Sequence, residues 1–589
     1  MENTDHDSRR RISLLWPKGS HTNNENSFVL GGGILRDLEL EIPFRTIAAS
    51  DQQYMEISHI LLKPSRDPAV ISYRQDIMDD LLRLPALRRV CREILPALET
   101  LRHSRLINQN AQNELYLITS RLSELESYMQ CVKRLHEEFG ALDRPPAAEG
   151  WRKLEETVTS LFRDETFTRL AREVPELVSR LRGIRSVTIG VNLDKNLLPR
   201  DAALVAVNKE YFVNKGGDTV LGRLFGDKHV AGESLTGLMH SVPRKQLHTP
   251  HGLLALDSDL FGHAANPLMV PLFNDLNNVM RKTAAPIGRA VKQFMSVHTA
   301  VLGDLKPEIV FYLGACDMVE RLKAAGLPVA RPEIRPEGER TCRVKNAYNV
   351  NLAFSLLAGG PCDLAGTVVT NDVSLDDEGR VVILTGPNRG GKTTYLQAVG
   401  LCQVLAQLGL PVPGEEAAVS PADGIFTHFP TEEKIDSGTG RLGDEARRIG
   451  DIFSRLTDKS LILLNETLSS TSAGESFFIA RDVVRVLAGL GTRCIYSTHL
   501  HELAAAVDQL NRTGGVADRI VSMVALVREE EMNGATKEMT RTYKIVKAPA
   551  AGFSYAREIA ERYGVSYKQL VDGLKGRGLA GRFVRDATE

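Results

Sequence analysis

Apolar residues recur three and four positions apart over much of the first half of the chain. One such stripe, with Phe139 on the same line, comprises Leu115, Ile118, Leu122, Leu125, Met129 and Val132. This spacing predicts a long helix whose apolar seam packs against neighbouring helices. A second helical group runs from residue 267 to about residue 325. The pattern therefore predicts a mainly helical region over residues 31–340.

A different pattern interrupts this helical region. Residues Ser186–Leu193 alternate between polar and apolar side chains, and Ala203–Val207 form a short apolar run. Alternation with a period of two is typical of a strand with one buried face. We therefore expect a β-containing insertion at about residues 180–265.

Continuous apolar runs replace alternation towards the C-terminus. They occupy Val381–Leu384 and Leu461–Leu464, a third strand is predicted at Arg493–Thr498, and a helical pattern covers Tyr395–Leu410. Short apolar runs that alternate with helices are typical of parallel strands covered on both faces. We therefore expect an α/β domain over residues 341–548.

The last part of the chain changes pattern again. A strand with alternating faces is predicted at Thr540–Val546, followed by two short helices at Tyr555–Tyr563 and Tyr567–Leu574. These helices would belong to a C-terminal segment over residues 549–589. By their pattern alone they would cap their own domain.

The first apolar strand of the α/β domain runs directly into a glycine-rich loop. Gly386, four further residues and Gly391-Lys392-Thr393 match the pattern G-x4-G-K-[ST]. In this pattern backbone N–H groups and a helix N-terminus cradle phosphates, the lysine bridges the terminal phosphates and the hydroxyl ligates Mg²⁺. The alternative is a glycine turn that binds no nucleotide. The predicted nucleotide-binding residues are Gly386, Pro387, Asn388, Arg389, Gly390, Gly391, Lys392, Thr393 and Thr394.

Two polar residues follow the second apolar strand. Asn465 and Glu466 would stand at its carboxyl end, beside the phosphates. A nucleotide site of this kind usually has an Asp-Glu pair there, with the aspartate serving Mg²⁺ and the glutamate polarising the attacking water. Asn465 would weaken metal binding or slow turnover, while Glu466 keeps the role of general base. The alternative is that both residues merely cap the strand.

Two further residues are candidates for the same site. His499 follows the third strand, and it would sense the γ-phosphate or position the attacking water, although a core or loop histidine is the simpler interpretation of His499 alone. Tyr348 precedes the α/β domain and would stack on a nucleotide base or fill the core. We predict Glu466, His499 and Lys392 as catalytic residues, and Thr393 with Asn465 as the metal site.

These segments together resemble the MutS family of ABC-type ATPases. The resemblance is carried by Val368–Leu375, Gly386–Leu396, Leu405–Pro413, Asp423–Thr427, Thr471-Ser472, Thr498-His499 and Gly552–Ala556. It implies an α/β, ABC-type P-loop ATPase domain preceded by a mainly helical lever or core region with an embedded β-containing clamp. It further implies ATP and Mg²⁺ as cofactors, double-stranded DNA as a partner, and a homodimer with two composite ATP sites, in which the C-terminal helices pack across the dimer interface.

Two segments depart from the family pattern. Where the family has Asp-Glu-Ile-Gly-Arg-Gly-Thr-Ser, residues Asn465–Ser472 read Asn-Glu-Thr-Leu-Ser-Ser-Thr-Ser. The segment that contacts the partner's ATP in the family is also unusual, and either Ser437 or Thr439 would take that role. Arg441 would act on the partner's site or form an ion pair with Asp444 or Glu445.

The resemblance also suggests which DNA is bound. Sequence that resembles the family's lever region already begins near residue 57, which leaves no room for the family's mismatch-reading and connector domains. We therefore expect structured or branched DNA rather than single mismatches as the ligand. Two other functions stay open: a nucleotide-gated interaction protein with negligible hydrolysis, and an ATPase that binds structured RNA or a ribosome.

Composition limits the classes of protein that fit the chain but does not indicate a function. Lys and Arg number 73 against 74 Asp and Glu, and the net charge of −1 neither supports nor excludes binding to nucleic acid. Seven scattered cysteines without a C-x-x-C pair indicate reduced thiols in the cytoplasm. No apolar run is long enough to span a membrane. Residues 1–30 are polar and are expected to be flexible, and the protein would associate with the nucleoid when on DNA.

Overall fold

The computed structural model describes residues 12–17, 27–107, 114–182, 186–193, 195, 199–208, 210, 287, 289–291, 294, 299–360, 362–430, 440–468, 472–512, 519–532, 536–549 and 567–576. The chain divides into two compact units. The helical unit comprises residues 1–12, 84–146 and 151–306, and the sheet unit comprises residues 13–83, 147–150 and 307–589. Among the described residues, no helix is both long and apolar enough to cross a membrane.

Long helices dominate the helical unit. They are α5 (Pro85–Ile107), α6 (Glu114–Ala141), α7 (Glu149–Arg163, which starts at the boundary between the units) and α8 (Glu165–Arg182), and the short α12 (Ala300–Gly303) follows. The seam predicted on α6 is confirmed, since Leu122, Leu125 and Val132 are buried and α6 lies against α5 and α8. Of the second predicted helical group, residues 267–286 lie outside the described residues.

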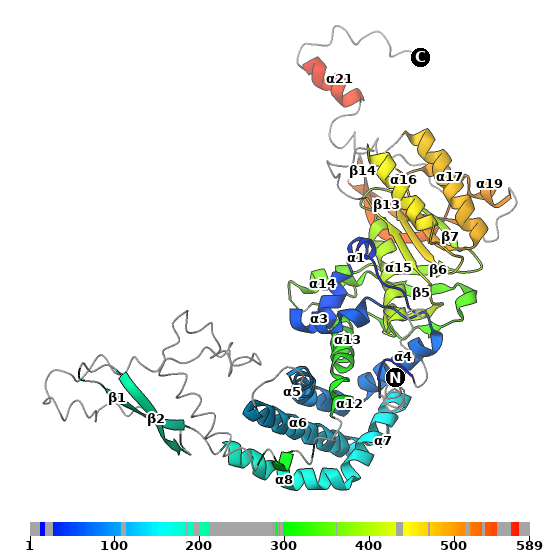
Figure 1. The fold of residues 1–589 in the computed structure, drawn as a ribbon. Coiled ribbons are helices and arrows are strands. Elements are labelled where there is room, and N and C mark those ends of the chain that lie inside the picture. Colours follow the sequence, from blue (N-terminus) through cyan, green and yellow to red (C-terminus); the bar gives the residue numbers. More distant parts are fainter. Residues whose placement is uncertain are drawn as a thin grey trace. The chain divides into compact units, whose positions relative to one another are not determined.

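Both predicted strands of the insertion are present. β1 (Ser186–Leu193) pairs with β2 (Pro199–Asn208) as an antiparallel ladder, visible in Figure 1. The register shifts twice along the ladder. Most of the remaining insertion, residues 211–265, lies outside the described residues, so a clamp there stays a prediction.

The sheet unit is built on a six-stranded sheet in the order β10-β11-β12-β7-β13-β14. The strands are β7 (Val381–Thr385), β10 (Ile425–His428), β11 (Leu461–Asn465), β12 (Arg493–Ser497), β13 (Ile520–Met532) and β14 (Thr536–Lys547). All neighbours are parallel except β13 and β14. The three predicted apolar strands are therefore confirmed as the adjacent strands β7, β12 and β11.

Helices and smaller sheets surround this six-stranded sheet. They are α1 (Gly32–Asp37), α2 (Glu41–Ile47), α3 (Asp51–Leu61), α4 (Pro68–Arg83), α13 (Lys306–Ala324), α14 (Val350–Leu357), α15 (Lys392–Gln407), α16 (Gly440–Phe453), α17 (Ala473–Leu490), α18 (His501–Ala505), α19 (Val507–Arg512), α21 (Tyr567–Gly576), the 3-10 turn η3 (Glu337–Glu339), and the strands β3 (Val329–Ala330), β4 (Glu333–Ile334), β5 (Cys342–Ala347), β6 (Asn371–Leu375), β8 (Val412–Pro413) and β9 (Glu416–Val419). The second predicted C-terminal helix is α21, whereas the first lies outside the described residues.

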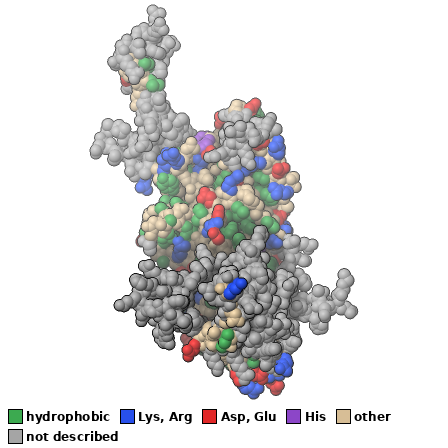
Figure 2. Space-filling model, turned by 60° about the vertical axis from the view of Figure 1, so that its left-hand side comes forward, with side chains coloured by type: hydrophobic (Ala, Val, Ile, Leu, Met, Phe, Trp, Pro, Cys, Tyr) green, Lys and Arg blue, Asp and Glu red, His purple; other side chains and the backbone are tan. Residues whose placement is uncertain are grey.

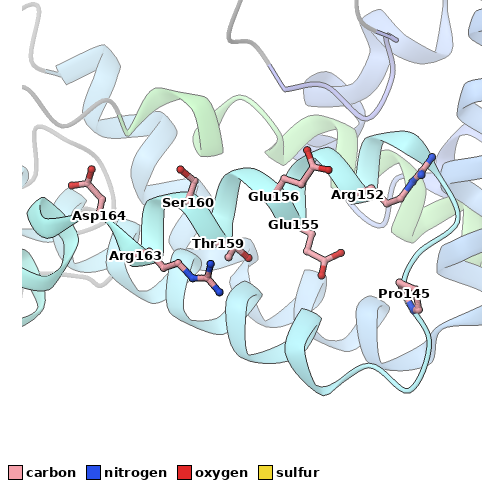
Figure 3. A pocket seen from close by; sticks show the side chains of 8 residues that line it. All are labelled: Pro145, Arg152, Glu155, Glu156, Thr159, Ser160, Arg163 and Asp164. Carbon is pink, nitrogen blue, oxygen red and sulfur yellow. The ribbon is translucent and has the colours of Figure 1, made fainter.

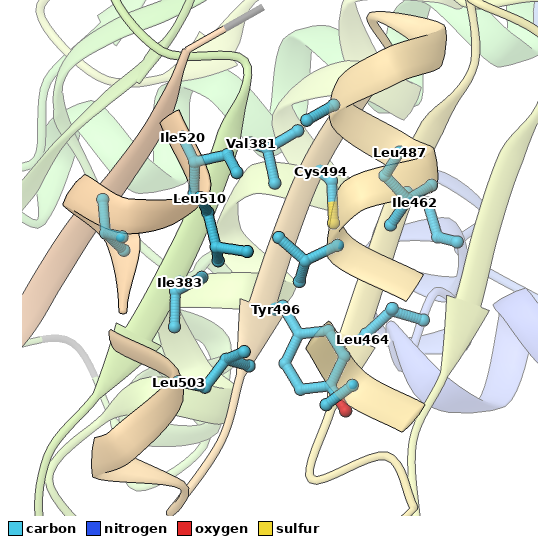
Figure 4. Close-up of a cluster of buried hydrophobic side chains, with 14 of the residues drawn as sticks. Val381, Ile383, Ile462, Leu464, Leu487, Cys494, Tyr496, Leu503, Leu510 and Ile520 are labelled. Carbon is cyan, nitrogen blue, oxygen red and sulfur yellow. The ribbon is translucent and has the colours of Figure 1, made fainter. Parts of the chain in front are cut away.

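A cluster of apolar side chains packs one face of the sheet under α17, α18 and α19. Figure 4 shows Ile383, Ile462, Cys494 and Tyr496 from three neighbouring strands in contact with helix residues such as Leu487. Because the strands are covered, every residue of β7, β11 and β12 is buried rather than every second one. This packing holds the carboxyl ends of β7, β11 and β12 at one edge of the sheet.

Residues 13–83 belong to the sheet unit, although their sequence pattern groups them with the helical region. A Cβ placed on Gly400 would come within 2.7 Å of the Leu38 side chain, so α15 accepts that leucine only because residue 400 is glycine. Thr427 Oγ1 also donates to the buried Asp37 carboxylate at 2.8 Å. The N-terminal helices thus form part of the support of α15 and β10.

Candidate nucleotide-binding site

The glycine-rich loop connects β7 directly to α15. Gly386 has φ 139° and Gly391 has φ 89°, both in the region that favours glycine. A Cβ on Gly386 would stand 2.7 Å from Ala525 Cβ, so a side chain there would collide with β13. The left-handed Gly391 precedes the first turn of α15, which leaves the N–H groups of that turn directed at the loop. The loop geometry therefore suits an anion such as a phosphate.

Lys392 lies folded across this loop. Its Nζ donates to the carbonyls of Gly386 and Pro387, both at 3.0 Å, and the residue is only 5% exposed. Burial lowers the pKa of Lys392, and the negative charge of Glu466 opposes that shift. A charged ammonium held by two carbonyls would exchange them for phosphate oxygens, which offer stronger charge-assisted hydrogen bonds.

Asn465 and Thr393 meet at the start of α15. Asn465 Nδ2 donates to Thr393 Oγ1 at 3.2 Å, while Asn465 Oδ1 is buried without a hydrogen-bond partner. A hydroxyl beside an unsatisfied amide oxygen fits the oxygen ligands that Mg²⁺ prefers. Within the described residues, no cluster of three or more His, Cys, Asp or Glu could hold a metal by itself. A metal here would therefore take further ligands from phosphates and water.

Glu466 and His499 are brought together because β11 and β12 are neighbouring parallel strands, with Asn465 opposite Ser497. Glu466 Oε1 and His499 Nε2 are 2.9 Å apart, and Glu466 N–H donates to Ser497 O at 2.8 Å. The pKa of Glu466 is lowered, first by the hydrogen bond from His499, against the effect of burial, and then by the charges of His499 and Lys392. The carboxylate therefore stays ionised, as a general base requires.

The turn after Glu466 contains contacts that sequence reasoning missed. Glu466 has φ 49° and Leu468 φ 63°, which non-glycine residues rarely adopt. Two contacts hold Thr467, which lies between these two residues. Its Oγ1 is 3.0 Å from His428 Nδ1, and its carbonyl accepts a hydrogen bond of 2.9 Å from Tyr496 Oη. The only signal in the sequence was the departure from the family pattern, because Leu468 stands where the family has glycine. The contact with the buried His428 ring thus helps to hold a backbone conformation that glycine adopts without strain.

Aromatic residues near the loop differ from the expectation. Tyr348 is only 1% exposed, and burial raises the pKa of its hydroxyl. Its burial favours the core role over stacking on a base. Tyr543, on β14, is instead 47% exposed, and its Cδ1 lies 3.4 Å from the position that a Cβ on Gly391 would occupy. Since β14 is remote in sequence, no local pattern could have placed Tyr543 beside the loop.

The predicted trans residues cannot be placed in the site. Ser437 and Thr439 lie outside the described residues, as does the side chain of Arg441. The two acids proposed as partners of Arg441 are described: Asp444 pairs with Arg447 at 3.2 Å, and Glu445 is buried. The roles of Ser437 and Arg441 stay predictions.

A groove in the helical unit offers no comparable chemistry. It has a volume of about 680 Å³ and runs along α7 (Figure 3). Figure 3 shows the carboxylates of Glu155, Glu156 and Asp164 pointing in different directions, alongside Arg152 and Arg163. Because these acids do not converge, the groove lacks the arrangement of a metal or acid–base site.

Comparison with known proteins gives the family. Residues 382–571 match MutS domain V, and residues 66–325 match the MutS2 N-terminal domain. The mainly parallel sheet covered by helices defines an α/β protein. The two matches together cover well over half of the chain, and the chain belongs to the MutS family.

Individual relatives match about a third of the chain. The DNA mismatch repair protein MutS of Synechococcus sp. (strain CC9605) is 35% identical over 196 residues, 33% of this chain and 20% of that protein. The DNA mismatch repair protein MutS 2 of Halobacterium salinarum is 34% identical over 198 residues, 33% of this chain and 21% of that protein. The DNA mismatch repair protein Msh6 of Gallus gallus is 32% identical over 200 residues, 32% of this chain and 15% of that protein. The chain therefore spans about a fifth of the length of the relatives it matches.

Proposed function

We propose that the protein is an ABC-type, Mg²⁺-dependent ATPase whose nucleotide cycle controls its grip on DNA. One observation carries the ATPase assignment. Lys392 and Thr393 at the start of α15, Asn465 at the end of β11, Glu466 directly after it and His499 shortly after β12 converge at one edge of the sheet. Phosphate binding, metal binding and water activation need these residue types within reach of one another.

The proposed mechanism follows from these contacts. The loop N–H groups and Lys392 would hold the terminal phosphates, and Thr393 with Asn465 would hold Mg²⁺, which would supply charge neutralisation at the phosphates. Glu466, ionised and aligned by His499, accepts a proton from the attacking water. The exposed ring of Tyr543, which borders Gly391, would stack on the nucleotide base.

Homodimerisation and DNA binding are proposed from the family alone. MutS domain V is matched here, and relatives are named DNA mismatch repair proteins. Surface charge adds nothing to the argument, because lysine, arginine, aspartate and glutamate are interspersed on the described surface in Figure 2. Two composite sites would close on ATP and alter the grip of the helical unit. The preference for branched DNA over single mismatches stays a prediction.

Phosphate release tests the ATPase assignment. Wild-type protein, Glu466→Gln and Lys392→Ala would be compared in single-turnover and steady-state assays with Mg²⁺. We expect Glu466→Gln to bind ATP but to release phosphate at least about a hundredfold more slowly than the wild type, because the water loses its base. Lys392→Ala should lose nucleotide binding itself.

A second candidate function is a nucleotide-gated switch without turnover, and Asn465 is the observation that favours it. An amide carries no charge for the metal where an aspartate would carry one. Equal phosphate release by the wild type and Glu466→Gln would establish the switch and refute the ATPase.

Binding to homoduplex, mismatched and four-way-junction DNA, with and without ATP, tests the partner at two salt concentrations. A nucleotide-dependent preference for the junction would support branched DNA. Binding to structured RNA in place of any DNA would instead support the RNA or ribosome alternative.

A further inference from the structure

The sheet unit contains a cavity at the end of β7 that is opposite the glycine-rich loop. It has a volume of about 460 Å³, and its lining includes Arg335, Arg340, Arg343 and Arg380 together with the acids Glu339 and Asp377. Arg380 immediately precedes β7, whereas Gly386 immediately follows it. A strand of this length measures roughly 16 Å, so the cavity is separate from the nucleotide site.

Two arginines of this cavity form ion pairs with acids that are exposed to solvent. Arg335 pairs with Glu333 at 3.0 Å, and Arg380 pairs with Asp377. The Glu333 and Asp377 side chains are 60% and 87% exposed. Exposed ion pairs contribute little free energy because water screens them. A ligand anion could therefore replace the Glu333 carboxylate at small cost, and it would take the place of Asp377 as the partner of Arg380, whose side chain is only 5% exposed.

Inner contacts hold the other arginines in place. Arg343 pairs with the buried Asp376, and Arg340 donates to the carbonyl of Gly491 at 3.0 Å. Arg380 also donates to the carbonyl of Glu339 at 3.2 Å. These anchors give the guanidinium groups fixed positions around the cavity before any ligand arrives, which reduces the entropic cost of binding.

Another guanidinium lies directly beneath the lining. Arg493 is fully buried and donates to the carbonyls of Thr341, at 3.3 Å, and Ser420, at 2.8 Å. Burial, the largest cause, lowers the pKa of Arg493 to about 10, and the charges of Arg380 and Arg340 act in the same direction, against Cys342 and Asp423. The charges of Arg340, Arg380 and Arg493 thus act on one another, and a bound anion would relieve their repulsion.

We propose that this cavity binds a small anion that carries two or more phosphate groups. Guanidinium groups are planar forks that bind phosphate oxygens through paired hydrogen bonds. The volume lies in the lower part of the range of small-molecule sites, and the described lining contains no aromatic residue that could stack on a base. The site would therefore recognise the phosphates themselves. This inference goes beyond the proposed ATPase and does not depend on it.

Calorimetry with sodium pyrophosphate tests the site on the full chain. Because the glycine-rich loop is also proposed to bind phosphates, Lys392→Ala serves to remove that contribution. We expect pyrophosphate binding to persist in Lys392→Ala and to weaken by at least about tenfold in Arg335→Ala/Arg340→Ala, which loses two forks. Arg45→Ala is the matched control, since Arg45 is an exposed arginine of the same unit that pairs with Glu41 and lies outside the cavity.

Two further arms keep the test decisive. Arg343→Lys retains the charge but not the fork, so it should bind with intermediate affinity even if the double variant folds poorly. Tripolyphosphate should compete with pyrophosphate, and duplex DNA should not. Loss of binding in Lys392→Ala alone, an equal loss in Arg45→Ala, or competition by duplex DNA but not by tripolyphosphate would overturn the proposal. ATP turnover is measured separately, so a failure here is distinct from a failure of the ATPase assignment.

Discussion

Replacing Thr467 by valine tests whether the turn after Glu466 is held by His428. Valine has nearly the shape of threonine, so the substitution removes the hydroxyl without opening a cavity. Thr467 Oγ1 lies 3.0 Å from His428 Nδ1 and donates to His428 O at 3.4 Å. His428 is 2% exposed, and its Nε2 already has no hydrogen-bond partner. In Thr467→Val the ring would be left with both nitrogens unsatisfied.

Two magnitudes follow from this geometry. A buried polar group that loses its partner costs about 1–3 kcal/mol, so the free energy of unfolding should fall by that amount. Freed from this contact, the turn would let Glu466 leave the left-handed conformation that aligns it with His499. Moving a catalytic group by about 1 Å can lower the rate on the order of a hundredfold. We therefore expect kcat for ATP hydrolysis to fall about tenfold or more in Thr467→Val.

The assay pairs urea denaturation with steady-state phosphate release, and Thr427→Val is the matched control. Thr427 is the neighbouring residue of His428, and its hydroxyl donates to Asp37 at 2.8 Å, away from Glu466. In Thr427→Val the free energy of unfolding should fall by a comparable amount, roughly 1–3 kcal/mol, while kcat and KM stay at the wild-type values. The reasoning is refuted if Thr467→Val keeps wild-type turnover, or if Thr427→Val loses as much turnover as Thr467→Val does.

Three further predictions concern the same half of the chain. Asn465→Asp adds a charge beside Thr393, so the Mg²⁺ concentration for half-maximal phosphate release should fall about tenfold; an unchanged value would exclude Asn465 from the metal site. Tyr543→Ala should weaken binding of ATP about tenfold and Tyr543→Phe should not, as measured by calorimetry, because only the ring is needed for stacking. Burial lowers the pKa of His428 to about 4, below the value of 6.5 in the unfolded chain. Because the unfolded chain binds the proton first, the free energy of unfolding should be highest above pH 6.5 and should fall by about 3 kcal/mol towards pH 4. In urea denaturation at several pH values, His428→Asn should remove this dependence on pH.

Local patterns were sufficient to predict the central elements of the sheet unit. The apolar runs that became β7, β11 and β12 are continuous because the strands are covered on both faces. Parallel strands bring their carboxyl ends to one edge, and so the residues that follow them could be expected to meet at the glycine-rich loop. The contacts of Asn465 with Thr393 and of Glu466 with His499 agree with that expectation.

Contacts between distant segments were decided only by the tertiary structure. The approach of Tyr543 to Gly391, the placement of Leu38 against Gly400, and the arginine-lined cavity depend on strand order and register across the sheet. Such contacts leave no periodic trace, because periodicity reports which face of an element is buried but not what covers it. Local patterns therefore indicated the strands, the helices and the position of the glycine-rich loop, whereas packing between remote elements set which side chains surround each site.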